Sequence, residues 1–391
     1  MIIQPATRLG DVKEYYFSIK LKQIAKMRAE GASVLNLGIG SPDLPPSDST
    51  VAKLIDRALD DNNHAYQSYV GLSELRQAFA DWYAKYFGIQ LNADNEVLPL
   101  IGSKEGIMHI SMTFLEKGDE VLIPNPGYPA YRAVANLTGA TIVEYRLAEE
   151  NDWYPDLDEL AKRNLSKVKL MWINYPHMPT GTPADLTLFE QLVAFAKQHK
   201  ILIVNDNPYS FILNKQPMSL LAVEGAKEVA LELNSLSKSH NMAGWRVGML
   251  AGHKDYLQAI LRFKSNMDSG MFKPVQLAAV EALKNPVGWY KELNAEYQKR
   301  RELVFQLLDE IGATYNKNQV GMFVWAKKPE RFATAYEVSD YYLEHCHVFI
   351  TPGSIFGSQG DDYIRISLCS KPLVFQEAIE RVKREDAKTQ S

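Results

Sequence analysis

The spacing of apolar residues along the chain predicts several kinds of segment. Residues 13–30 carry apolar side chains at the spacing of a helix that ends at Gly31. Residues 33–40 form a short strand-like run that leads into a loop rich in glycine and proline. From about residue 50 to 275, strand-like runs alternate with segments of helical spacing; the runs are 96–101, 120–124, 141–145, 168–174, 201–205, 229–234 and 247–251. This alternation predicts an α/β fold, in which helices cover both faces of a mostly parallel sheet.

The last third of the chain has a different pattern. A long charged helix is predicted at about 287–311, and short apolar runs follow at 321–325, 348–350 and 363–368. A closing helix begins at Leu373. This order predicts a smaller α+β domain after the large α/β domain.

Composition narrows the class of protein. The 391 residues are 46% hydrophobic and 23% charged, which is ordinary for a globular protein large enough for two domains. The net charge of −4 gives no basic surface for nucleic acid, and the absence of an apolar run of 18 or more residues argues against a membrane span. No signal-peptide pattern opens the chain, and two cysteines do not make a disulfide framework. We therefore expect a cytoplasmic protein without nucleic-acid or membrane partners.

The tripeptide His345-Cys346-His347 raises the question of a metal site. If this segment is a strand, adjacent side chains point to opposite faces, and no second cluster of ligands follows. We therefore expect no metal here.

Lys238 is the most informative candidate for chemistry. It lies just after the predicted strand 229–234, among small hydroxyl residues, and Arg246 follows eight positions on. A lysine in this setting can form an imine with a carbonyl cofactor if its ammonium loses a proton. Taken alone, a surface or ion-paired lysine would be the commoner interpretation. Because ligands of open α/β sheets bind at the carboxyl ends of the strands, other polar residues at those ends become candidates too.

The fourteen residues around Lys238 resemble a known family. The pattern Ser-x-Ser-Lys-x-x-x-Met-Ala-Gly-Trp-Arg-Val-Gly at 235–248 resembles the lysine signature of class I and II aminotransferases, which bind pyridoxal 5′-phosphate (PLP) on fold type I. The resemblance implies a large domain at 47–275 with a seven-stranded sheet, and a discontinuous small domain made of 1–46 and 276–391. It also implies a two-step exchange of an amino group between an α-amino acid and a 2-oxo acid.

The resemblance implies that three residues contact the ring of the cofactor. Lys238 would hold PLP as an imine and then act as general base and acid on the substrate. Asp206 follows the buried run 201–205 and would keep the pyridine nitrogen protonated, although a helix N-cap is a common alternative for such a residue. Tyr209 matches the family's Asp-x-x-Tyr pattern and would donate a hydrogen bond to the phenolic oxygen, which lowers the pKa of the imine.

The resemblance also implies the remaining cofactor contacts. The ring of Tyr128 would stack on the cofactor, although a tyrosine packed locally in its turn is a serious alternative. The phosphate would lie at the glycine-containing turn 102–106, where a helix begins, and against hydroxyl and guanidinium groups. The phosphate residues are Ser103, Lys104, Ser235, Ser237 and Arg246.

Three more residues point to the substrate and to a partner subunit. Arg365 lies at the centre of an apolar strand, where a buried arginine is costly without an anion. The substrate's α-carboxylate would satisfy it, and a structural salt bridge is an equal alternative. Gly40 matches the loop that closes over this carboxylate. Tyr66 matches a tyrosine that reaches the phosphate of the neighbouring subunit, which implies a homodimer with shared active sites.

The chain departs from the family at 174–181. Asn174, His177 and Met178 lie in Asn-Tyr-Pro-His-Met-Pro-Thr-Gly, where the family has Asn-x-Pro-x-Asn-Pro-Thr-Gly. The family's second asparagine hydrogen-bonds the phenolic oxygen of PLP, and a thioether is a very weak acceptor. We expect an altered imine pKa, with Tyr209 as the main partner there. Either His177 replaces the amide, directly or through a water, or His177 packs in a turn and Met178 fills space.

Other functions stay open to different degrees. A PLP-dependent carbon–sulfur β-lyase would use the same residues, and sequence separates it poorly from an aminotransferase. A PLP-binding regulator would need a DNA-binding module, and none precedes residue 13. A non-catalytic scaffold is disfavoured because both Lys238 and Asp206 are present. The motifs are similar to those of subfamilies acting on alanine, methionine, aspartate or diaminopimelate; candidates to line the pocket are Tyr15, Tyr16, Phe17 and Ile19.

Overall fold

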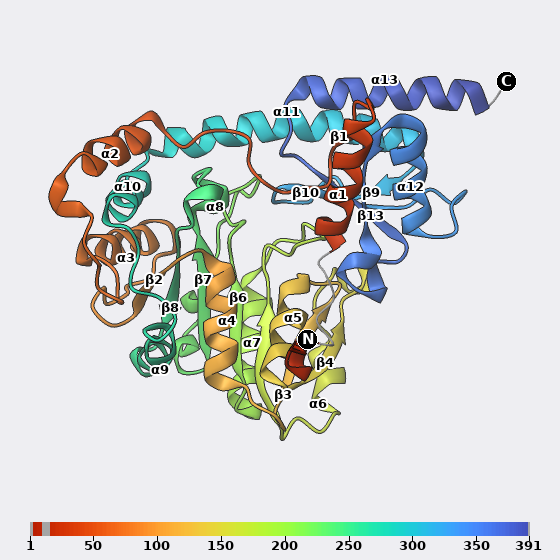
Figure 1. The fold of residues 1–391 in the computed structure, drawn as a ribbon. Helices are drawn as coiled ribbons and strands as arrows, with labels where there is room; N and C mark the ends of the chain where they lie inside the picture. Colours follow the sequence, from red (N-terminus) through yellow and green to blue (C-terminus); the bar gives the residue numbers. More distant parts are fainter. Residues whose placement is uncertain (1–2, 10–15, 390–391) are drawn as a thin grey trace.

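The computed structural model describes residues 3–9 and 16–389. Its centre is a seven-stranded sheet, and a second, four-stranded sheet lies beside the end of the chain (Figure 1). The strands of the large sheet are β2 (Val97–Leu100), β3 (Glu120–Asn125), β4 (Thr141–Arg146), β5 (Val168–Ile173), β6 (Leu202–Asp206), β7 (Ala230–Ser235) and β8 (Gly248–Gly252). Their order is β2-β8-β7-β6-β5-β3-β4. Only β8 runs antiparallel to its neighbours, so the predicted mostly parallel seven-stranded sheet is confirmed.

Helices cover both faces of this sheet. The helices of this part are α2 (Asp48–Ala58), α3 (Ser73–Phe87), α4 (Ser103–Phe114), α5 (Pro129–Thr138), α6 (Leu157–Ala161), α7 (Leu186–His199), α8 (Leu236–Ser239), α9 (Lys254–Lys264) and α10 (Lys273–Leu283). One apolar cluster joins the sheet to α4, α5 and α9, and a separate cluster joins it to α3, α7 and α10. Every residue of β6 and β7 is buried, which explains the apolar run at the start of β6; β7 also buries the polar residues Glu232 and Asn234.

The second sheet is formed by the last third of the chain, and a separate pair of short strands joins this part to the N-terminal segment. Its strands β9 (Thr314–Tyr315), β10 (Phe323–Lys327), β12 (Thr351–Pro352) and β13 (Tyr363–Ser367) are antiparallel in the order β12-β13-β10-β9. Beside it, β1 (Leu35–Asn36) pairs in parallel with β11 (Val348–Phe349). The helices here are α1 (Tyr16–Ala29), α11 (Val287–Ile311), α12 (Ala335–Cys346) and α13 (Pro372–Thr389). Long α11 extends from the large sheet to the small one (Figure 1). The domain boundaries at 46/47 and 275/276 stay a prediction.

Short 3₁₀ helices connect these elements, at Thr7–Leu9, Asp61–Asn63, Glu149–Asn151, Leu220–Ala222, Ala226–Glu228, Ala243–Trp245, Gly353–Phe356 and Ser358–Gly360. Within the described ranges, none of the helices is long and apolar enough to cross a membrane.

One local expectation was wrong. The segment His345-Cys346-His347 is not a strand: α12 continues through Cys346, and His347 caps it in the left-handed region at φ 54°. Apolar spacing does not show where α12 ends, because the strand β11 begins at Val348, directly after the single capping residue His347.

Candidate active site

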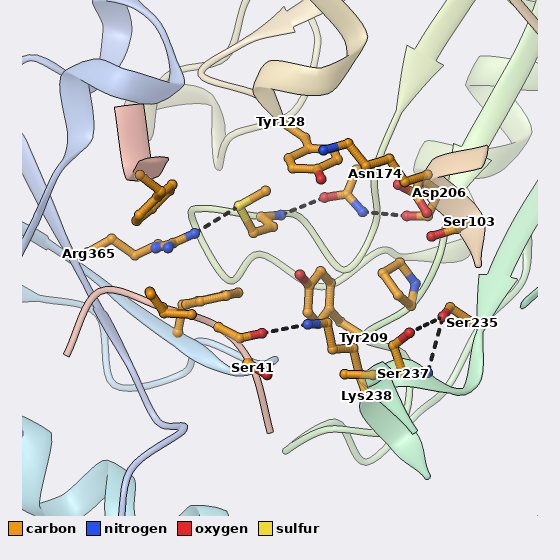
Figure 2. Close-up of a pocket in the computed structure, with 18 of the residues that line it drawn as sticks. Ser41, Ser103, Tyr128, Asn174, Asp206, Tyr209, Ser235, Ser237, Lys238 and Arg365 are labelled. Carbon is orange, nitrogen blue, oxygen red and sulfur yellow. Dashed lines mark hydrogen bonds between the residues drawn. The ribbon is translucent and has the colours of Figure 1, made fainter. Parts of the chain in front are cut away.

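A cavity of about 930 Å³ opens where the carboxyl ends of the parallel strands meet the second sheet (Figure 2). This is the edge at which open α/β sheets bind ligands. Twelve of the fourteen predicted site residues line it: Gly40, Ser103, Lys104, Tyr128, Asn174, Asp206, Tyr209, Ser235, Ser237, Lys238, Arg246 and Arg365. Residues separated by more than 300 positions in the sequence therefore share one pocket.

Lys238 lies on the single turn of α8, which follows β7 directly. Ser235 caps this turn by accepting a hydrogen bond from the backbone N–H of Ser237 at 3.1 Å. The Nζ of Lys238 donates to the carbonyl oxygen of Gly40 at 2.6 Å. Burial lowers the pKa of Lys238, and the nearby guanidinium groups of Arg365 and Arg246 lower it further. A lysine in this state releases its proton more easily, which a nucleophilic amine requires.

Asp206 ends β6 and is only 5% exposed. Its Oδ2 accepts a hydrogen bond from the Tyr131 hydroxyl at 3.1 Å, whereas its Oδ1 makes none among the residues that the structure describes. Burial raises the pKa of Asp206 to about 7, against the opposing effects of Tyr131 and Lys238. A buried carboxylate oxygen at a cavity wall fits a cationic N–H donor, and the pyridinium nitrogen of PLP is such a donor.

Tyr131 was missed from the sequence. It lies on the first turn of α5, where its ring stacks on Trp172 with 5.0 Å between centroids. Local sequence gave no signal for the contact with Asp206, because the two residues are 75 positions apart.

The part of the cavity wall near Ser103, Ser235 and Ser237 fits an anion (Figure 2). The N-terminus of α4 presents Ser103 and Lys104, and free backbone N–H groups at a helix start attract phosphate. Gly102 precedes them at φ 81°, and a Cβ there would overlap the guanidinium of Arg246. The Ser235 hydroxyl lies 2.8 Å from that of Ser237 on the neighbouring turn. Hydroxyl, guanidinium and backbone donors thus converge, and these residues fit the phosphate of PLP.

Arg365 lies in the middle of β13 and is 4% exposed. Its Nη2 donates to the carbonyl oxygen of Gly38 at 2.7 Å, and its Nη1 contacts the sulfur of Met178 at 3.3 Å (Figure 2). The guanidinium lies over the rings of Phe323, at 3.9 Å, and Phe356, at 4.6 Å. A planar cation held in this way at a cavity wall can bind a carboxylate with two hydrogen bonds.

The loop after β1 is held against this arginine. A Cβ at Gly40 would overlap the ring of Phe323, so only glycine allows the loop to approach so closely. Asp43, further along the loop, forms an ion pair with buried Arg300 of α11 at 2.6 Å. The pair anchors the loop that supplies the carbonyl oxygen to Lys238.

Two predicted residues lie elsewhere. Tyr66 is 92% exposed and does not line the cavity of this single chain. His177 is buried, with its Nδ1 2.8 Å from the Thr180 hydroxyl, and burial lowers its pKa to about 3. It does not line the cavity of Lys238, so the structure favours the alternative in which His177 packs in its turn.

The expectations for the N-terminal segment are met in part. Phe17 lines the cavity together with Ser18, Leu21 and Lys22, which the sequence did not single out. Tyr16 and Ile19 do not line it, because they point to other sides of α1. Tyr15 lies outside the described residues.

Comparisons with known proteins give a consistent result. The model of the family "Aminotransferase class I and II" matches residues 32–382. The LL-diaminopimelate aminotransferase of Halothermothrix orenii is 40% identical over 99% of this chain and 100% of its own, and that of Dehalococcoides mccartyi is 42% identical over 92% and 93%. Among solved structures, BacF from Bacillus subtilis has a TM-score of 0.94 at 35% identity, covering 98% of each chain. An aromatic aminotransferase from Pyrococcus horikoshii has a TM-score of 0.86 at 29% identity, covering 94% of this chain and 99% of its own.

Proposed function

The chain belongs to the class I and II aminotransferases, and from this membership we propose that it transfers amino groups with PLP bound at the cavity of Lys238. It is an aminotransferase that exchanges an amino group between an α-amino acid and a 2-oxo acid. The carbon–sulfur β-lyase alternative is not favoured, because the full-length relatives carry aminotransferase names. One observation supports the cofactor best: Lys238, Asp206 and Arg365 line one cavity, and the Oδ1 of Asp206 makes no hydrogen bond among the described residues.

Each residue has a defined task in this proposal. PLP, when bound, draws electrons away from the substrate's Cα and so makes its proton acidic. Lys238 would hold the cofactor, and its amine would serve as general base and acid for the proton at the substrate's Cα. Its lowered pKa leaves more of the neutral amine that can accept this proton. The carboxylate of Asp206 would accept a hydrogen bond from the N–H of the pyridine ring, and the Tyr209 hydroxyl would donate one to the phenolic oxygen.

The remaining contacts orient the two ends of the bound molecules. Backbone and side-chain donors of Ser103, Lys104, Ser235, Ser237 and Arg246 hold the phosphate, with Tyr128 against the ring. Arg365 binds the α-carboxylate of the substrate, and the loop of Gly40 closes over it. We propose LL-diaminopimelate, or an amino acid of similar length and charge, as substrate because relatives at 40% and 42% identity carry that name. The cavity volume of about 930 Å³ accommodates a long side chain beside the cofactor.

We further propose a homodimer in the cytoplasm. Tyr66 is 92% exposed, and the exposed ring of Phe272 packs against His64, which precedes Tyr66 by two positions. Exposed aromatic rings of this kind fit a subunit interface, through which Tyr66 would reach the partner's phosphate. Both cysteines are free and buried, which agrees with a reducing compartment. The division into a domain at 47–275 and one made of 1–46 and 276–391 belongs to the same proposal.

A panel of amino acids tests the reaction. The purified protein, loaded with PLP, is incubated with each amino acid in the presence and absence of 2-oxoglutarate as acceptor. The expected result is a new 2-oxo acid that forms in quantity only with the acceptor. Release of oxo acid and ammonia without the acceptor would contradict the aminotransferase assignment. The Lys238→Ala variant should lose activity and the visible absorbance of the bound cofactor, while circular dichroism shows an unchanged fold.

A further inference from the structure

Met178 occupies the position at which the family carries an amide, and the structure shows what its side chain contacts instead. The residue is 6% exposed and lines the cavity. Its sulfur lies 3.3 Å from the Nη1 of Arg365, which places the thioether beside the guanidinium (Figure 2). Its backbone N–H donates to the Oδ1 of Asn174 at 2.8 Å, so the main chain holds the residue in place.

The surroundings of Arg365 explain why this contact matters. The guanidinium has apolar rings on its faces, from Phe323 and Phe356, and a backbone carbonyl at Nη2. The thioether is the contact at Nη1, on the side of the motif at 174–181. The sulfur is a weak acceptor for one of the two N–H groups of Nη1, so this contact can persist and hold the guanidinium in place while a carboxylate binds other N–H groups of Arg365.

The other groups of the motif do not replace the missing amide. The Nδ2 of Asn174 donates to the carbonyl oxygen of Asp206, and its Oδ1 accepts from Met178, so both ends of this amide are used. His177 lies outside the cavity and bonds Thr180. Tyr209 lines the cavity, with its ring edge-on to Phe323 at 5.9 Å between centroids. The family uses two side-chain donors at the phenolic oxygen, the second asparagine and the tyrosine. In this chain the asparagine is Met178, so the Tyr209 hydroxyl is the donor that remains.

We propose that Met178 is a positioning residue for substrate recognition: its thioether steadies Arg365 for the incoming carboxylate, and Tyr209 alone serves the phenolic oxygen of the cofactor. The proposal rests on the proposed function, since it presumes PLP at Lys238 and a carboxylate at Arg365. An amide at position 178 could contact both Arg365 and the phenolic oxygen of the cofactor. In this chain, according to the proposal, Met178 serves only the first contact and Tyr209 only the second.

Substitutions at one position can test the two tasks separately. Met178→Leu keeps the volume and removes the sulfur, and Met178→Asn restores the family's amide. Met171→Leu is the matched control, because Met171 is a fully buried methionine of β5 that does not line the cavity. Tyr209→Phe removes the hydroxyl. For each holoenzyme we would measure kcat and KM, competitive inhibition by propanoate, which has a carboxylate and no amine, and the pH titration of the cofactor's visible absorbance.

The expected results differ between the variants. Met178→Leu should raise the amino-acid KM and the inhibition constant of propanoate by about threefold, the effect of losing one weak hydrogen bond. Its kcat and the pKa of the absorbance titration should equal those of the Met171→Leu control. Met178→Asn should lower the titration pKa, because an added donor favours the more anionic phenolic oxygen. Tyr209→Phe should raise the titration pKa, and by less when combined with Met178→Asn.

Several outcomes would overturn the proposal. If Met178→Leu binds propanoate as well as the Met171→Leu control does, the thioether only fills space. If Met178→Leu moves the absorbance titration, Met178 acts on the cofactor and the separation of tasks is wrong. An unchanged titration in Tyr209→Phe would remove Tyr209 from its role. Failure of the proposed function looks different, because wild-type protein would then show no cofactor absorbance that depends on Lys238.

Discussion

Replacing Asp206 with asparagine should stabilise the cofactor-free protein while it destroys the enzyme. Asp206 is 5% exposed, and its Oδ1 makes no hydrogen bond among the described residues. In the cofactor-free protein, ionisation therefore leaves a buried charge with one hydroxyl donor, Tyr131. Asparagine keeps the shape of the side chain and cannot ionise, so it removes this cost.

The size of the effect follows from the pKa. Burial raises the pKa of Asp206 from 3.8 to about 7. Below pH 3.8 the group is protonated in both states and has no effect. As the pH rises toward 7, the unfolded chain releases the proton that the folded protein keeps, so the free energy of unfolding falls. Above the folded pKa the loss is constant, at about 4 kcal/mol. This value is an upper bound, because local relaxation and water entry reduce it.

Urea unfolding of the cofactor-free protein, at one protein concentration, checks this prediction. Asp206→Asn should exceed wild type by about 1.5 kcal/mol near pH 5 and by up to about 4 kcal/mol near pH 8. Asp158→Asn, an exposed substitution that removes the same charge on α6, should stay within about 0.5 kcal/mol of wild type. Saturating PLP should stabilise wild type more than Asp206→Asn, because the pyridinium partner is then present. An equal advantage at both pH values, or none, would refute the reasoning.

Three further substitutions have defined outcomes. Tyr131→Phe keeps the ring and removes the hydrogen bond that lowers the pKa of Asp206, so PLP affinity should fall about tenfold in a fluorescence titration. Gly40→Ala forces the loop away from the aromatic ring beneath it, and kcat/KM should fall at least about tenfold while circular dichroism is unchanged. Asp43→Asn leaves buried Arg300 with one carboxylate partner fewer, and thermal unfolding should show a loss of about 3 kcal/mol.

The sheet and the outline of the site could be predicted from the sequence for a simple physical reason. Buried parallel strands are continuous apolar runs, and the polar residue that follows such a run lies at the ligand-binding edge. Asp206 follows a run of this kind, Lys238 comes three residues after the buried strand β7, and the structure places both in one cavity. The periodicity of α1 and α11 was equally visible, because each buries one stripe along its length.

Contacts between distant elements could not be predicted in this way. The bond from Tyr131 to Asp206 joins residues 75 positions apart, and the contact between Arg365 and Met178 joins residues 187 positions apart. No local spacing encodes either pair. The first depends on how α5 packs on the large sheet, and the second on how the two sheets are placed relative to one another. For this reason the sequence could point to the departure at Met178 but gave no means of finding Arg365 as the group that its sulfur contacts.

The charged groups that line the cavity cost folding free energy when they are buried without a ligand, and a ligand of complementary charge reduces this cost. Lys238, with its lowered pKa, donates to a backbone carbonyl, and Asp206, with its raised pKa, keeps one oxygen outside any described hydrogen bond. Arg365 lies against a carbonyl, a thioether and aromatic rings. Each of the three groups is therefore stabilised either by binding a group of opposite charge or by losing its own charge. The proposed cofactor, with a pyridinium, an aldehyde and a phosphate, and then a substrate carboxylate would supply these partners. The same contacts would then both bind the ligands and relieve the cost of the buried charges.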